Sequence, residues 1–452
     1  MASAGSSSMD SFEAELNPCS LETIPEPMRL RRRDNTTQQV WPLVLCCYQL
    51  DETIGYRRGQ LQLFHITVPD VTSNQPSLPL HFGLPDEILK PSITSGILDG
   101  KWSAVTAGGG RRRRRRRRLF ATAHASGEIK LHQLQKMTVL DIDDDDNNVN
   151  TTTTAALRDE ADECFTLDFV AQSNLPTEER GIPPLCLSLN FASKVLHNNT
   201  TPSIDPGALP PPLPIVSTYS NGKVAIHDAV FLESGGISLV QRDAWHAHNM
   251  FTNPAEVWSA DFCNHDAHVV VVSCGDEGKV KLWDVRATTR PMHVLSPFDA
   301  GATCASTHPR HEYLVACGSY DETLCLLDTR YLSTKQPVSR SKELGGGIWR
   351  IKWHPYKEER MLVAAMHGGC RVVEVGNWDS LEDEDEPSYD NLNDYEAQFS
   401  FQVTKEFCEH ESMAYGADWL VCQHPTRNGF FEAAASCSFY DRAVFLWDSC
   451  AD

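Results

Sequence analysis

The sequence predicts an all-β fold, a seven-bladed β-propeller, and three observations support this prediction. A unit made of an apolar strand, a tight turn and an alternating strand recurs along the chain. Histidine, aspartate and tryptophan residues hold fixed places in the clearest copies. Weaker copies bring the total to seven. One such unit cannot bury its own apolar face, so the copies must stack on one another to form a core.

The three clearest copies are "HVVVVSCGDEGKVKLWDVR", "YLVACGSYDETLCLLDTR" and "AAASCSFYDRAVFLWD". They are typical of WD repeats, in which a histidine ahead of the unit, a serine or threonine, the turn aspartate and the tryptophan form a hydrogen-bonded tetrad. Because a buried polar group is costly unless it is paired, we expect these residues to be structural. The candidate tetrads are His248, Ser273, Asp276 and Trp283 in one unit, and His410, Asp441 and Trp447 in the last. Glu277, next to Asp276, leaves the identity of the first acid open.

The whole chain, residues 1–452, is predicted to be a single propeller domain. The expected blades span approximately residues 11–90, 91–145, 160–235, 245–295, 300–340, 345–405 and 410–450. The chain stops just after Trp447, at the end of the third strand of the last blade. Closed propellers often complete one blade with strands from both termini, which removes exposed edges, so residues 1–16 are expected to supply the fourth strand.

Three low-complexity insertions interrupt the repeat, at residues 108–118, 141–154 and 381–394. The first holds eight consecutive arginines, whose charges repel one another and favour a solvated loop. The alternative is an electrostatic contact to RNA or to an acidic partner, including the "DIDDDD" run of this chain. No aromatic residues alternate with the arginines to stack on bases, so sequence-specific recognition of nucleic acid is not expected.

The composition is that of an ordinary soluble globular protein, with 41% hydrophobic and 22% charged residues. The net charge of −21 favours cationic partners. The 15 cysteines are scattered and lack the spacing of zinc sites, so we expect reduced thiols, no metal and no cofactor. The sequence shows neither a secretory signal nor an apolar run that could span a membrane. A cytoplasmic monomer without membrane contact is therefore predicted.

Several segments are more specific than a general WD repeat. They are "FDAGATCASTHPRHEYLVACGSYDETLCLLDTR", "LGGGIWRIKWHP", "MLVAAMHGGCRVVEV", "HESMAYGADW" and "SCSFYDRAVFLWD". Together they resemble the diphthine methyl ester hydrolase family, also called diphthine methyltransferase, the WD-repeat proteins of diphthamide biosynthesis. The resemblance is densest from about Trp245 to Asp448 and does not extend to the arginine tract. It implies an ester hydrolase that removes the methyl group from the diphthine intermediate on translation elongation factor 2.

A ring of aromatic side chains is expected where the first strands of the blades begin. Trp258, Trp349 and Tyr415 hold the same place in three blades, and Phe165 holds it in the expected third blade. The substrate that the resemblance implies carries a trimethylammonium group, and aromatic faces bind quaternary ammonium groups. These four residues are therefore candidate substrate contacts. Ordinary packing at the strand entrance is the alternative.

The chemistry of ester hydrolysis needs a base, a nucleophile and donors to the developing oxyanion. The chain has no G-x-S-x-G motif, so a water-mediated reaction or a nucleophile in the central channel remains open. The candidate catalytic residues are His367 as a base, Glu256 as an acid or base, and Arg350 as an oxyanion or carboxylate contact. Asp418 is a further candidate substrate contact, and Gly345–Gly347 is a candidate source of amide donors or only a tight turn.

A non-enzymatic scaffold is the competing prediction. "LWDVR" and "LLDTR" resemble the WDxR box by which propellers dock as substrate receptors on cullin-type ubiquitin ligases. Arg286 and Arg330 would then contact the ligase adaptor.

Overall fold

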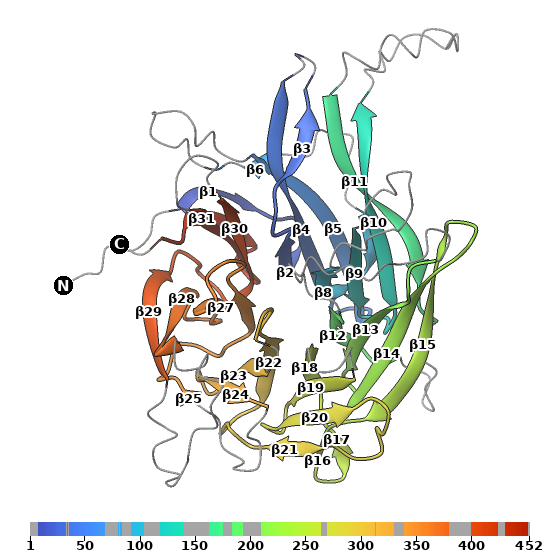
Figure 1. The fold of residues 1–452 in the computed structure, drawn as a ribbon, viewed down its shortest axis with the longest axis vertical. Coiled ribbons are helices and arrows are strands. Elements are labelled where there is room, and N and C mark those ends of the chain that lie inside the picture. The colour runs from blue at the N-terminus through green and yellow to red at the C-terminus, as the bar shows by residue number, and fades with distance from the viewer. Residues whose placement is uncertain are drawn as a thin grey trace, which may run out of the picture.

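The structure is a seven-bladed all-β propeller, which confirms the predicted fold class (Figure 1). This computed structural model describes residues 8–32, 34, 36–67, 80, 82–83, 92–103, 118–139, 162–174, 183–192, 209–263, 269–311, 313–329, 339–378, 399–423 and 430–450. The predicted loop insertions at 108–118, 141–154 and 381–394 lie outside the described residues, except for Arg118. No helix among the described residues has the length and apolar character needed to cross a membrane.

The first three blades are antiparallel sheets, in which the strands follow one another from the axis outward. Blade one consists of β2 (Asn17–Thr23), β4 (Thr37–Asp51), β5 (Tyr56–Thr67) and β6 (Phe82–Gly83), with β3 (Met28–Arg31) beside β4 and β7 (Ser92–Ser95) beside β5. Blade two consists of β8 (Ile97–Trp102), β9 (Leu119–His124), β10 (Ile129–Val139) and β11 (Asp162–Gln172). Blade three consists of β12 (Cys186–Phe191), β13 (Leu213–Tyr219), β14 (Lys223–Phe231) and β15 (Ile237–His246).

A small hairpin of β16 (Asn249–Met250) and β17 (Asn253–Pro254) precedes blade four. Blade four consists of β18 (Val257–Cys263), β19 (Val270–Gly275), β20 (Val280–Asp284) and β21 (His293–Leu295). Blade five consists of β22 (Ala302–Thr307), β23 (Leu314–Ser319), β24 (Leu324–Asp328) and β25 (Ser339–Arg340). Blade six consists of β26 (Arg350–Trp353), β27 (Arg360–Ala364), β28 (Cys370–Gly376) and β29 (Ser400–Phe407). Blade seven consists of β30 (Ala414–Gln423), β31 (Phe430–Ser438), β32 (Ala443–Asp448) and β1 (Ser8–Glu13).

The last blade is closed by a strand from the start of the chain. β1 pairs antiparallel with β32, with Ser11 opposite Phe445 and Glu13 opposite Ala443. The expectation that residues 1–16 supply the outermost strand is therefore confirmed. This pairing joins the two ends of the chain in one sheet, so β32 has no open edge.

The core lies between the blades. Among the described residues, seven buried apolar clusters occur, one at each junction of neighbouring blades. At the closing junction, Leu45 of blade one and Leu446 of blade seven belong to the same cluster. Each innermost strand also contacts the next one around the ring, including β30 with β2. The seven blades therefore form a closed circle, and the starts of their innermost strands meet at one face of the disc.

One expected blade boundary is wrong. The sequence around Phe165 was predicted to open blade three at residues 160–235, but β11 pairs along β10 as the outermost strand of blade two. Its alternating pattern resembles that of an innermost strand, yet its hydrogen-bonding partner is the strand that precedes it in the chain. Blade three instead begins with β12 and ends with β15 at His246.

Candidate active site

A β-bulge near the start of the innermost strands sets which side chains face the channel. The register of six of these strands shifts at one residue, and the shifted residues are Cys19, Leu98, Leu187, Trp258, Thr303 and Tyr415. In blade six, Trp349 lies just before β26 and donates its backbone N–H to Ala364. A bulge redirects the residues that follow it. The next residues therefore form two layers around the axis.

The upper layer, directly after the bulge, is mainly polar. It contains Ser20, Asp99, Ser188, Ser259, Cys304 and Arg350. The lower layer, two residues further on, carries most of the charge. It contains Glu22, Lys101, Asn190, Asp261, Ser306, Lys352 and Asp418. Most of these side chains line a cavity of about 230 Å³, whose other lining residues lie towards the ends of the innermost strands and include none of Trp258, Trp349 and Tyr415. Strands from all seven blades thus build one polar channel.

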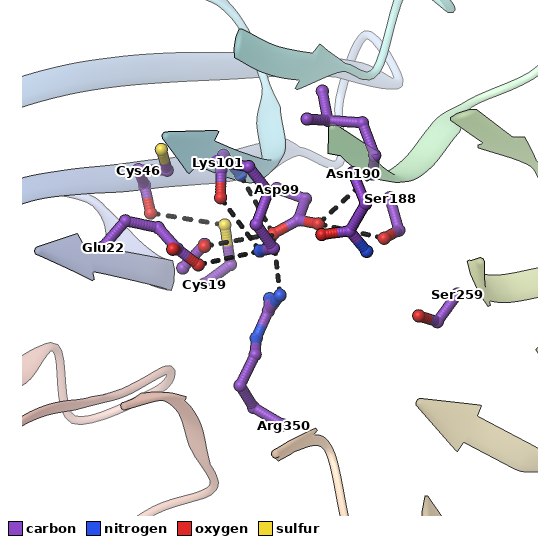
Figure 2. Close-up of polar contacts among 12 residues, drawn as sticks. Cys19, Glu22, Cys46, Asp99, Lys101, Ser188, Asn190, Ser259 and Arg350 are labelled. Atoms are coloured by element: carbon purple, nitrogen blue, oxygen red, sulfur yellow. Dashed lines mark hydrogen bonds and ion pairs between the residues drawn. The ribbon is translucent and has the colours of Figure 1, made fainter. Parts of the chain in front are cut away.

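Asp99 is the hub of the upper layer (Figure 2). Its carboxylate accepts hydrogen bonds from Lys101 Nζ at 2.7 Å, Ser188 Oγ at 3.0 Å and Ser20 Oγ at 3.1 Å, and it pairs with Arg350 at 2.9 Å. Burial opposes ionisation of Asp99, but the charges of Arg350 and Lys101 outweigh burial and hold the pKa of the carboxyl well below its usual range. Asp99 is therefore a permanently charged anchor and a poor base.

Arg350 reaches across the channel to Asp99 from blade six (Figure 2). Burial alone would lower the pKa of Arg350, but the carboxylates of Asp99 and Glu22 raise it above its ordinary value. The Nε atom of Arg350 is buried and has no hydrogen-bond partner among the residues that the structure describes. A buried donor without a partner is costly, so this atom is suited to an acceptor oxygen from a ligand.

The lower layer is a row of alternating charges. Glu22 pairs with Lys101 at 2.8 Å and also with Lys352, which lies 3.4 Å from Asp418. Asp418, predicted to contact substrate, also accepts the backbone N–H of Thr23 at 2.8 Å and so links blade seven to blade one. Burial raises the pKa of Asp418, although Lys352 opposes that shift. Much of the hydrogen-bonding capacity of Asp418 is therefore used in holding neighbouring blades together.

Three of the four predicted aromatic contacts come together above the upper layer. The ring centroids of Trp258 and Trp349 are 5.6 Å apart, and those of Trp349 and Tyr415 are 4.9 Å apart. Tyr320, which sequence reasoning missed, lies 6.2 Å from Trp258 and 6.3 Å from Trp349. Tyr320 follows a strand instead of beginning one, so the alignment of strand starts could not find it. We call Trp258, Tyr320, Trp349 and Tyr415 the aromatic cluster.

Carboxylates adjoin the aromatic cluster. The indole N–H of Trp258 donates to Asp276 at 3.0 Å, and the backbone of Asp276 donates to the carbonyl of Glu256. Burial raises the pKa of the Tyr320 phenol, and the charges of Asp276 and Glu256 raise it further. The predicted catalytic residue Glu256 is half-buried beside the cluster. Negative charge next to aromatic faces favours a cationic ligand.

Two predicted site residues lie elsewhere. Phe165 is buried on β11 and packs against His65 at 5.7 Å, between blades one and two, so its predicted place among the channel aromatics is wrong. His367 is exposed in the turn between β27 and β28, at the rim of the disc where the innermost strands begin. It does not line the polar channel.

The triple glycine has a packing role. A side chain at Gly346 would bring its Cβ within 2.2 Å of the Ala365 carbonyl oxygen and 2.6 Å of the Gly368 nitrogen. Gly345 has a φ of +88°, a conformation that other residues rarely adopt. This segment therefore passes close to the backbone of the β27–β28 turn and positions Trp349.

The first tetrad contains Glu277 in place of the predicted Asp276. His248 Nε2 lies 2.7 Å from Ser273 Oγ, Trp283 donates to the same hydroxyl at 2.9 Å, and His248 Nδ1 lies 2.9 Å from Glu277. Glu277 already contacts the Nδ1 atom of His248, and Asp276 instead accepts the indole N–H of Trp258. Desolvation lowers the pKa of His248, which keeps it neutral.

In the tetrad of blade seven, a serine hydroxyl lies between the histidine and the aspartate. His410 lies 2.8 Å from both Ser436 and Ser438, and Trp447 donates to Ser436 at 3.1 Å. The Ser438 hydroxyl donates in turn to Asp441. Both tetrads are buried or half-buried parts of the blades, away from the channel cavity.

No activated thiol faces the channel among the described residues. The 15 cysteines form no disulfides, and only Cys408 and Cys450 are exposed. Cys19, at the bulge of β2, donates to the Ile97 carbonyl at 2.8 Å. Burial raises the pKa of the Cys19 thiol well above its usual value. A thiol in this state is a weak nucleophile.

Of the two predicted ligase contacts, Arg286 and Arg330, the structure describes only Arg286. Arg286 is exposed and its guanidinium pairs with Asp284 at 2.7 Å. Arg330 lies outside the described residues. The scaffold prediction therefore stays a prediction.

Comparisons with known proteins agree with the WD-repeat fold. A family model described as "WD domain, G-beta repeat" matches residues 241–284. The "Diphthine methyltransferase homolog" of Dictyostelium discoideum is 30% identical over 244 residues, 52% of this chain and 59% of that protein. The human "Diphthine methyltransferase" is 30% identical over 211 residues, 46% of this chain and 40% of the relative.

These two matches span about half the length of the relatives. The "Diphthine methyltransferase" of Saccharomyces cerevisiae is 25% identical over 442 residues, 88% of this chain and 91% of the relative. The likeness therefore extends through the whole propeller. This chain is therefore similar to proteins named diphthine methyltransferase, and it shares the WD repeat with the matched family model.

Proposed function

We propose that this protein acts in diphthamide biosynthesis as a carboxylic ester hydrolase, which removes the methyl ester from the diphthine intermediate on translation elongation factor 2. The names of its relatives support the pathway. In the substrate, the methyl ester and the trimethylammonium group are attached to the same carbon atom. A site for this residue therefore needs a cation-binding surface and an oxyanion donor within a few ångströms of each other.

The observation that carries the proposal is the adjacency of Trp349 and Arg350. Trp349 belongs to the aromatic cluster, and Arg350 lies in the upper layer of the channel directly beneath it. The rings of the cluster touch one another, so the trimethylammonium group would bind over their exposed faces. Each favourable contact of this kind contributes about 0.5–2 kcal/mol.

In the proposed reaction a water oxygen attacks the ester carbonyl carbon, the bond from that carbon to the methoxy oxygen breaks, and methanol leaves. The second product is the diphthine carboxylate. The Arg350 guanidinium stabilises the oxyanion that forms during the attack. Glu256 accepts the proton of the attacking water and returns one to the leaving methoxide, and His367 at the rim is the second candidate base. Asp99 holds Arg350 in place.

Methyl release from methylated elongation factor 2, followed by mass spectrometry, tests the proposal. Arg350→Gln is expected to lower the rate about 100-fold or more, because it removes a charged oxyanion donor. Trp349→Ala and Tyr415→Ala are expected to raise KM for the substrate about tenfold each. Phe169→Ala, an exposed aromatic on β11 outside the channel, is the matched control. Full turnover by the folded channel variants would overturn the site.

A further inference from the structure

The most exposed large apolar side chains gather on one face of the disc. Phe251 is 97% exposed, Ile54 is 71% exposed and Tyr440 is 66% exposed. Phe251 lies in the hairpin just before β18, Ile54 in the turn between β4 and β5, and Tyr440 in the turn after β31. All three segments lie at the end of the blades where the innermost strands begin. We call this end the strand-start face.

Phe251 is held in an unfavourable conformation. Its φ is +56°, a value that a bulky residue rarely adopts, and the short pairing of β16 with β17 fixes it at the tip of the hairpin. The ring gains almost no contact within the chain in return. An exposed aromatic residue that is presented in this way is typical of a binding contact.

A groove beside Phe251 leads towards the aromatic cluster. Its lining includes Phe251, Asp276, Phe298 and Gly301. Asp276 also accepts the indole N–H of Trp258, which belongs to the cluster. The groove and the candidate active site therefore share a wall.

The same face carries a regular set of acids. The loops that lead into the innermost strands of blades four to seven contain Glu256, Asp299, Glu343 and Glu411. Three of these residues, Asp299, Glu343 and Glu411, are exposed. These acids, of which Asp299 also pairs with Arg340 at 3.5 Å, fit a partner with basic and apolar side chains.

We propose that the strand-start face is the docking surface for the protein substrate, and that it receives a basic segment with apolar side chains beside the modified residue. The inference rests on the proposed function, because a side chain that reaches the aromatic cluster must come from a partner lying on this face. Phe251 and Ile54, from blades on opposite sides of the aromatic cluster, would contact the partner, and the acids would orient it.

The test compares two substrates, intact elongation factor 2 carrying methylated diphthine and the isolated methylated diphthine amino acid. The double variant Phe251→Ala with Ile54→Ala removes the apolar contacts, and Glu343→Lys with Glu411→Lys reverses the charge. Met292→Ala with Val294→Ala, at exposed apolar positions beside and within the outer strand β21, is the matched control. Thermal melting checks that each variant is folded.

We expect both docking variants to raise KM for the intact protein about tenfold or more and to leave kcat unchanged. Hydrolysis of the isolated amino acid should stay at the wild-type rate. Unchanged KM for the protein, or an equal loss with both substrates, would overturn the docking role.

Binding of elongation factor 2 to the immobilised protein is measured separately from methyl release. If the wild type binds the factor and the docking variants lose that binding, the docking role is supported. If the wild type binds the factor but releases no methyl group, only the proposed reaction is wrong. If the wild type does not bind the factor at all, the docking surface is wrong.

Discussion

At the scale of single residues, the pair of Asp99 and Arg350 carries the strongest electrostatic constraint in the channel. Asp99 accepts hydrogen bonds from two side-chain hydroxyls and one ammonium group, and its ion partner is buried with it. Removing one member of a buried ion pair leaves the other charge uncompensated. The pair is therefore both a stability element and the support that fixes the guanidinium.

Asp99→Asn is expected to lower the free energy of unfolding by about 3 kcal/mol or more, because Arg350 loses its counter-charge. The folded-state pKa of Asp99 is lowered from 3.8, so its contribution is present above about pH 4 and is lost as the pH falls towards the folded-state value.

Denaturant unfolding of the wild type and of Asp99→Asn at a series of pH values checks this prediction. The difference in stability between the two proteins should be largest at neutral pH and should shrink below about pH 4. A difference that stays constant down to strongly acidic pH would contradict the assignment of a charged Asp99.

The two candidate bases can be separated by substitution. Glu256→Gln is expected to lower kcat about 100-fold, since the half-buried carboxylate adjoins the aromatic cluster and a lost general base typically costs that much. His367→Gln should have a smaller effect, because His367 is exposed at the rim. Rates of methyl release across pH measure both variants. A larger loss with His367→Gln would reverse the two roles.

Sequence reasoning located part of this site. Trp258, Trp349 and Tyr415 could be found because each holds the same place at the start of an innermost strand. Asp99 and Lys101 could not, because a bulge decides which residues of the strand face the channel, and a bulge depends on pairing with the next strand. Phe165 was misplaced for a related reason, since an alternating pattern does not reveal which neighbour a strand pairs with.

At the scale of elements, tryptophans in the second half of innermost strands link the blades. Trp102, Trp353 and Trp419 each donate an indole N–H to a backbone carbonyl of the preceding blade, that of Glu22, Ser306 and Lys352 respectively. The same contact thus recurs at three junctions. It explains why the weaker repeats share an aromatic residue at this place.

Trp419→Phe keeps much of the ring and removes the N–H donor. It is expected to lower the free energy of unfolding by about 1 kcal/mol, because the Lys352 carbonyl loses its hydrogen bond. Trp419→Ala should cost about 3–5 kcal/mol, since a buried ring is also lost. Urea denaturation measures both variants. Equal effects of the two substitutions would show that the hydrogen bond, and not packing, dominates.

At the scale of the whole molecule, the ring is held shut by a strand from its own N-terminal segment. The repeated unit was enough to predict seven blades and this closure, because an open propeller would leave an unpaired edge. The docking face could not be predicted in this way, because it is formed by loops of different blades that only the closed disc brings together.

Deleting residues 1–13 is expected to leave β32 as an open edge and to favour aggregation. The thermal midpoint should fall, and light scattering should rise with protein concentration. Disruption of the Arg442–Glu13 ion pair by Glu13→Gln serves as the milder control, because that pair is exposed. A truncated protein as stable and soluble as the full chain would contradict the role of β1.

The most direct test of the central claim follows the oxygen atoms in water enriched in the heavy oxygen isotope. If the channel hydrolyses the ester by attack of water on the carbonyl carbon, one heavy oxygen atom enters the diphthine carboxylate and unlabelled methanol is released. Arg350→Gln should lower the rate at which both signals appear about 100-fold or more in protein that a thermal melt shows to be folded. If the methyl group is lost with no heavy oxygen in the carboxylate, or if wild-type protein releases no methyl group, the account is wrong.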